Sequence, residues 1–111
     1  MIETNYNFQK LDGNITEKVI QKVVDEDNAA LIHMKFTKGE GLPEHYSNSN
    51  VYMIVARGML TLKLGEQEPH KYEEGSIISI PYNVKMNVNN FDENLLEMFV
   101  VKAPNPRNYK E

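Results

Sequence analysis

The stretch GEGLPEHYSNSNVYMIVARG, residues 39–58, joins turn-forming residues to a strand-like run and contains one histidine, His45. Glycines bound it at both ends, and Ser and Asn residues at 47–50 favour a turn in its middle. From residue 51 onward, successive side chains of a strand would point to opposite faces. One face would then carry the apolar side chains Val51, Met53 and Val55, and the other Tyr52, Ile54 and Ala56.

On both sides of this stretch, turn residues separate short apolar runs of strand length, such as 59–64, 77–80 and 95–101. Many short strands at such spacing are typical of a β-sandwich or β-barrel. Residues 17–24 fit two structures, because their apolar side chains recur at helical spacing while their β-branched content favours a strand. We predict a strand, since residues 29–36 follow directly across an Asp-Asn turn and would pair with it.

Length and composition exclude several classes of protein. A chain of 111 residues is of single-domain length, so we predict one domain over 1–111, with 103–111 as an extended tail because of its two prolines. The absence of cysteine excludes disulfides, a thiolate nucleophile and cysteine-bound metal clusters. A net charge of -4 with scattered lysines argues against nucleic acid, and no run approaches the roughly 20 apolar residues of a membrane span. We therefore expect a cytoplasmic protein.

The opening stretch and residues 75–90 together resemble the two motifs of the cupin superfamily. In the first motif, Gly39, His45 and Gly58 stand at the family spacing, but Ser47 replaces the second histidine and Val51 the glutamate. In the second motif, the structural positions are kept by Gly75, Pro81 and Asn90, whereas Asn83 replaces a glycine and Met86 the histidine. This resemblance implies an all-β fold, the double-stranded β-helix or jelly-roll barrel.

The resemblance also implies where a site would lie. Of the four side chains that usually hold a metal in this family, only His45 remains, and one imidazole cannot hold a divalent ion selectively. We therefore predict no metal and no cofactor. An apolar interior with a polar rim would suit a small organic ligand instead. The predicted ligand-binding residues are His45, Ser47, Val51, Met53, Tyr82, Met86 and Asn90.

Several alternatives stay open at the level of sequence. His45 is also a candidate acid or base of a metal-free isomerase or epimerase, or one ligand of a metal-dependent isomerase or dioxygenase-like enzyme that recruits ligands outside the usual positions. It could equally be a structural histidine in a filled, non-catalytic barrel. A soft copper(I) site at His45, Met53 and Met86 is a further alternative. The other histidines are expected to face solvent: His33 lies opposite in parity to its apolar neighbours, and His70 lies beside a turn.

The outward-facing parity of the opening strand has its own implication. Tyr52, Ile54 and Ala56 are apolar, so a second layer of the chain or a second subunit should cover them. We expect a homodimer.

Overall fold

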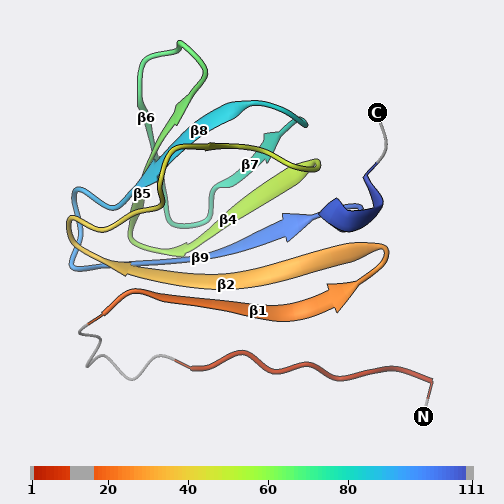
Figure 1. Ribbon diagram of the computed structural model, residues 1–111. Helices are drawn as coiled ribbons and strands as arrows, with labels where there is room; N and C mark the ends of the chain where they lie inside the picture. Colours follow the sequence, from red (N-terminus) through yellow and green to blue (C-terminus); the bar gives the residue numbers. More distant parts are fainter. Residues whose placement is uncertain (1, 11–16, 110–111) are drawn as a thin grey trace.

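The computed structural model describes residues 2–10 and 17–109, and the regular secondary structure of this part of the chain is almost entirely β-strand (Figure 1). Nine strands follow one another along it, and a single turn of 3-10 helix, η1, comes after the last strand. The elements are β1 (Val19–Glu26), β2 (Ala29–Thr37), β3 (His45–Tyr46), β4 (Val51–Arg57), β5 (Met59–Leu64), β6 (His70–Glu73), β7 (Ile77–Ile80), β8 (Lys85–Asn89), β9 (Leu95–Lys102) and η1 (Pro106–Asn108).

The strands form two antiparallel sheets that enclose one core. One sheet has five strands in the order β1-β2-β9-β4-β7, and the other has four in the order β3-β8-β5-β6. The chain passes from the first sheet to the second between β4 and β5, at Gly58. Apolar side chains of both sheets meet in a single cluster of buried residues. This arrangement confirms the predicted all-β, double-stranded β-helix fold.

The ambiguous segment at residues 17–24 contributes to a strand, as predicted. β1 spans Val19–Glu26 and pairs antiparallel with β2 across the turn at residues 27–28. A bulge between Lys22 and Val24 accommodates one extra residue, Val23. The β-branched side chains of β1 favour a strand over a helix, and they suit a half-buried strand at the edge of a sheet.

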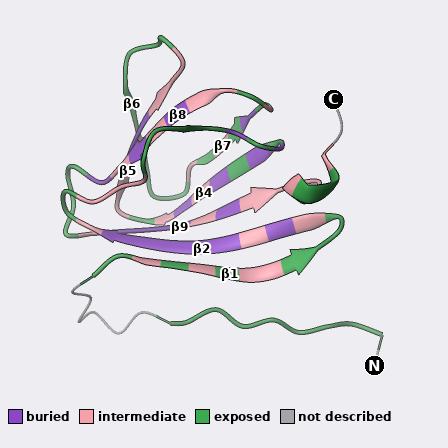
Figure 2. Cartoon of the chain, in the orientation of Figure 1, coloured by how far each residue is buried: buried purple, intermediate pink, exposed green. Residues whose placement is uncertain are grey.

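The alternation expected of the opening stretch is present in β4. Val51, Met53 and Val55 are buried, whereas Tyr52 on the opposite face is 41% exposed. Figure 2 shows the same change of face as alternating bands along β4, and it shows β2, on the other side of β9 in the same sheet, as largely buried. The inner face of the five-stranded sheet therefore supplies most of the buried core cluster, ten of its fourteen residues, and its outer face is partly open to solvent.

Turn positions with positive φ lie where the two motifs have glycine. Gly58 has a φ of 90° at the crossing between the sheets. Asn83 has a φ of 63°, the left-handed conformation that asparagine tolerates better than most residues. The replacement of a motif glycine by Asn83 is thus compatible with the backbone that the motif requires.

The C-terminal segment differs from the extended tail predicted for residues 103–111. Residues up to Tyr109 are described, and they include η1, at whose start the side chain of Asn105 accepts a hydrogen bond from the Arg107 backbone N–H at 3.2 Å. Proline at the first position of η1 is compatible with a helical turn, because its fixed φ is already close to helical. The Arg107 guanidinium pairs with Asp25 at 2.7 Å and with Asp27 at 3.0 Å, which fastens the segment to the β1–β2 turn.

The prediction that His33 faces solvent is wrong. His33 does lie on the outer face of β2, but it is only 1% exposed, because the rings of Phe8 and Phe99 pack against it with centroids 4.9 and 4.8 Å away. In the tautomer with hydrogen on Nε2, it donates to the Glu97 carboxylate at 2.7 Å. The alternation along β2 predicted the correct face for His33. It could not show that Phe8, from the N-terminal segment, packs over that face. His70 is exposed, as expected.

None of the helices in the described residues is long and apolar enough to cross a membrane.

Candidate functional site

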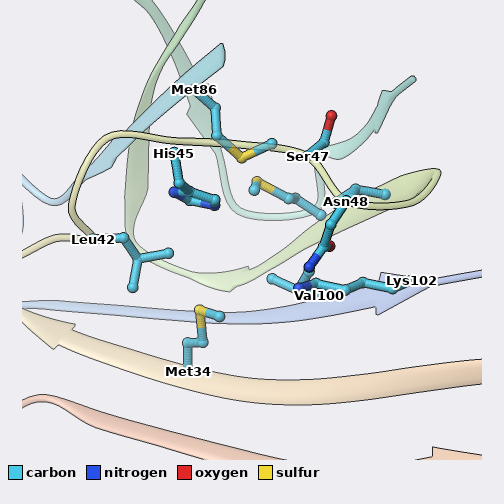
Figure 3. Close-up of a pocket in the computed structure, with 10 residues that line it drawn as sticks. Met34, Leu42, His45, Ser47, Asn48, Met86, Val100 and Lys102 are labelled. Carbon is cyan, nitrogen blue, oxygen red and sulfur yellow. The ribbon is translucent and has the colours of Figure 1, made fainter. Parts of the chain in front are cut away.

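A small cavity opens between the two sheets beside His45 (Figure 3). Its volume is about 40 Å³. Most of its wall is aliphatic or thioether, and of its polar side chains those of His45 and Asn48 are exposed. The lining residues are Met34, Leu42, His45, Ser47, Asn48, Val51, Met53, Met86, Val100 and Lys102. Five of the seven predicted ligand-binding residues are therefore brought together here: His45, Ser47, Val51, Met53 and Met86.

His45 reaches the cavity because β3 pairs with β8, which places His45 directly opposite Met86. Directly opposed residues of an antiparallel pair point to the same face, so the remaining histidine and the methionine at the second motif's histidine position are neighbours. The Nδ1 of His45 lies 2.8 Å from the Pro43 carbonyl oxygen. When Nδ1 carries the hydrogen, it donates to that carbonyl, and Nε2 keeps a lone pair with which it can accept a hydrogen bond or bind a cation.

Ser47 lines the cavity, but its hydroxyl is engaged in holding a turn. The hydroxyl donates to the Pro81 carbonyl at 2.6 Å and accepts from the Val84 backbone N–H at 2.8 Å. The Ser47 backbone N–H also donates to the Val84 carbonyl at 3.0 Å. Ser47 therefore fixes the connection between β7 and β8 beside the cavity, in agreement with the turn-forming role that serine often has.

The other two predicted ligand-binding residues, Tyr82 and Asn90, do not line this cavity. The ring of Tyr82 stacks on Tyr109, with centroids 4.2 Å apart. Asn90 is fully buried, and its amide donates to the carbonyl oxygens of Phe36 at 3.0 Å and Glu93 at 2.9 Å. Its position at the end of the second motif thus serves the β8–β9 connection, because the amide satisfies backbone groups that would otherwise be buried unpaired.

Sequence reasoning missed half of the cavity wall. Met34 comes from β2 and Val100 and Lys102 from β9, which lie next to each other in the five-stranded sheet although they are far apart in sequence. A usable signal existed in β9, where Leu96, Met98, Val100 and Lys102 alternate as one face. Leu42 and Asn48 come from connecting segments, where no periodicity gives the direction of a side chain.

The donor set of the cavity does not fit the metal that the fold implies. At the positions of the other usual ligands stand Ser47, whose hydroxyl is already paired, and Val51 and Met86, which offer neither imidazole nor carboxylate. Among the described residues no group of three or more His, Cys, Asp or Glu side chains is placed to hold a metal ion. One imidazole beside thioethers is a poor site for a divalent ion such as zinc or iron, which prefers nitrogen, thiolate or carboxylate ligands.

Comparison with known proteins gives a consistent picture. No protein-family model matches the chain. An uncharacterized protein of Methanocaldococcus jannaschii is 44% identical over 107 residues, which cover 96% of this chain and 90% of that protein. The crystal structure of an RmlC-like cupin family protein with a double-stranded β-helix fold, from the same organism, matches with a TM-score of 0.88 at 44% identity. The match covers 96% of this chain and 95% of that one.

Two more distant structures share the fold alone. A cupin superfamily protein from Desulfitobacterium hafniense matches with a TM-score of 0.73 at 9% identity, over 84% of this chain and 83% of that one. An RmlC-like cupin protein from Desulfovibrio desulfuricans matches with a TM-score of 0.72 at 17% identity, over 88% of this chain and 96% of that one. These two likenesses say nothing about a substrate, because one fold carries many functions.

Proposed function

Because the chain belongs to the RmlC-like cupin family but keeps only His45 of the family's usual metal ligands, we propose that it is a metal-free cupin that binds a small organic molecule in the cavity beside His45. The observation that carries this proposal is the composition of the cavity wall. Most of the wall consists of buried aliphatic and thioether side chains, while His45 and Asn48 are exposed and Lys102 is half-buried. Apolar walls with a few polar groups are typical of small-molecule sites.

The size of the cavity limits the ligand. A water-sized group needs roughly 10–15 Å³ of this kind of volume, so a cavity of about 40 Å³ holds only a few such groups. The methionines of the wall, Met34, Met53 and Met86, have flexible side chains that can rearrange around a slightly larger body. We therefore propose a ligand with a short, compact alkyl part and one polar end.

Methionine methyl groups provide a direct test of binding. We expect small molecules with one branched alkyl body (isobutanol, isobutyramide, isobutyrate or isobutylamine) to shift the ¹³C-methyl NMR signals of Met34, Met53 and Met86. These three methionines line the cavity, whereas Met59 and Met98 do not, so the signals of the latter two should stay in place. The titration is repeated with His45→Ala, which should weaken the response, and with His70→Ala, an exposed histidine away from the cavity, which should not.

Two results would overturn the proposed function. If none of the four molecules moves the three cavity methionines, the barrel is a filled scaffold without a ligand. If the purified protein carries a stoichiometric transition metal, including copper(I), that is lost in His45→Ala, the cavity is a metal site. Elemental analysis of the native protein and of the variant distinguishes these outcomes.

We further propose that the outer face of the five-stranded sheet joins two copies of the chain. Ile54 lies between Ile77 of β7 and Phe99 of β9 in one cross-strand row, and Tyr52 stands beside this row. Ile77 is 68% exposed although it is apolar. β7 is also an edge strand, whose free backbone groups can pair with another strand. An apolar row that continues to an open edge favours a second copy, because a two-fold axis would cover both rows at once.

The oligomeric state tests this proposal. The native protein should have the mass of a dimer by light scattering after size exclusion, and Ile77→Asp should give a monomer because it places a charge in the apolar row. Ile20→Asp is the matched control, since Ile20 is 50% exposed on β1, the edge strand at the other end of the same sheet. A monomeric native protein, or a dimer that survives Ile77→Asp and is lost with Ile20→Asp, would contradict the proposed interface.

A further inference from the structure

Lys102 occupies an unusual position at the end of β9. It lies directly opposite Ala30 of β2 and Val51 of β4, which are both buried and apolar. Opposed residues share a face of the sheet, so the Lys102 side chain extends into the end of the barrel rather than away from it. Figure 3 shows it at the cavity together with Asn48, across from His45. A half-buried lysine between apolar neighbours loses hydration, which costs free energy unless an anion compensates.

The part of the chain that the structure describes does not supply that anion. None of its ion pairs includes Lys102. The acidic side chain that lines a cleft together with Lys102 is Asp25, in a neighbouring cleft of about 290 Å³. Asp25 is already bound by Asn105 at 2.6 Å and by Arg107 at 2.7 Å. The Asn105 hydrogen bond, with the charges of Lys22 and Arg107, holds the pKa of Asp25 below its ordinary value, as expected for a carboxylate with satisfied partners.

The charges around Lys102 favour an incoming anion. Lys22 from β1, Arg107 from the C-terminal segment and Asp25 line the same cleft, and Asp25 is the one acidic residue of its described lining. Asp25 pairs with Lys22 at 3.9 Å and with Arg107 at 2.7 Å, and Arg107 also pairs with Asp27 at 3.0 Å, so among the described residues Lys102 is the cation of the cleft without an ion pair. His45 faces Lys102 across the cavity, and β2 and β4 present only apolar side chains there. Burial, followed by the charge of Lys22, lowers the pKa of Lys102 below its ordinary value. Both causes are expected for a lysine ammonium that has lost hydration and has no counter-ion nearby.

From this placement, we propose that the ligand of the cavity is a short-chain carboxylate, whose carboxylate group pairs with the Lys102 ammonium while its alkyl part lies among the methionines. The inference rests on the proposed function and specifies its ligand class. The small volume of the cavity limits the alkyl part to a few carbon atoms. The Lys102 ammonium, which has no ion-pair partner among the described residues, favours a negative charge at the polar end. Asn48, beside Lys102 at the mouth, offers amide N–H groups to the second carboxylate oxygen.

Binding of this kind is coupled to the protonation of Lys102. A carboxylate beside the ammonium raises the lysine pKa, so the complex takes up a proton wherever the free protein has partly lost it. Affinity for a carboxylate therefore falls as pH rises through the pKa of Lys102 in the free protein. A neutral ligand of the same shape has no such dependence, because it does not discriminate between the two forms of the lysine by charge.

Paired titrations with isobutyrate and its neutral isostere isobutyramide test the inference, with the methyl shifts of Met34, Met53 and Met86 as the readout. We expect isobutyrate to bind roughly tenfold more tightly than the amide, as a charge-assisted hydrogen bond provides. Lys102→Met should abolish this preference and leave amide binding intact. Lys38→Gln, which removes an exposed lysine that lines neither the cavity nor the cleft, should preserve the preference.

Lys102→Arg provides a readout that a structural role would not move. Arginine keeps its charge at every accessible pH, so the variant should still prefer isobutyrate but should lose the decline of affinity that the native protein shows as pH rises through the pKa of Lys102. Equal affinities for isobutyrate and isobutyramide in the native protein, or a preference that survives Lys102→Met, would overturn the carboxylate inference and leave the proposed function standing. Failure of both molecules, and of isobutanol and isobutylamine, would overturn the two together.

Discussion

Gly58→Ala is expected to lower the free energy of unfolding by about 3–5 kcal/mol, near the upper end of single-residue effects. A Cβ at this position would lie 2.2 Å from the backbone oxygen of Leu95 and 3.1 Å from the Cα of Leu96. Both are backbone atoms of the neighbouring β9 region, so they cannot rotate away as a side chain could. The φ of 90° adds strain for any residue with a side chain.

Gly39→Ala is the matched control for this prediction. Gly39 opens the same motif and has a φ of 91°, but a Cβ there would meet no atom within 4 Å. Only the backbone strain applies, which costs about 1–2 kcal/mol. Urea unfolding of both variants, followed by circular dichroism, gives the two values. Equal losses would show that conformation, and not the approach of β9, explains the glycine at position 58.

Glu97→Ala is expected to lower the free energy of unfolding by about 2–4 kcal/mol, because it leaves a buried histidine without a partner. Glu97 accepts hydrogen bonds from His33 Nε2 at 2.7 Å and from Arg57 Nε at 3.1 Å. His33 Nδ1 already has no hydrogen-bond partner. Among the described residues it is the one buried side-chain nitrogen or oxygen atom without such a partner. Loss of Glu97 would leave both ring nitrogens of His33 unpaired beneath Phe8 and Phe99.

Two further variants separate the contributions within this cluster. Arg57→Ala removes a guanidinium that is half exposed, so it should cost no more than about 1 kcal/mol. The double variant His33→Phe with Glu97→Leu replaces both buried partners by apolar groups and should recover most of the stability that Glu97→Ala loses. Unfolding by urea measures all three. A Glu97→Ala variant as stable as Arg57→Ala would show that His33 finds water or another partner when its carboxylate is gone.

Much of the candidate site could be predicted because its residues lie in strands whose register the motifs fix. His45 and Val51 stand at motif spacing, and period-two alternation then places Met53 on the same face as Val51. Met86 follows from the second motif, and the structure pairs it with His45. Asn90 occupies its motif position but does not line the cavity. Its buried amide, which follows the end of β8, instead donates to backbone carbonyl groups.

The sequence by itself determined the fold and the loss of the usual metal ligands, since the spacing of Gly39, His45 and Gly58 and the identity of each side chain are local properties of the chain. The tertiary structure alone decided that the positively charged side chain of Lys102 lies at the cavity and that His33 is the buried histidine. Lys102 meets Val51 because β9 lies beside β4, and Phe8 covers His33 from far along the chain. Such contacts depend on strand order and on the packing of distant segments, which the periodicity of a single strand does not encode.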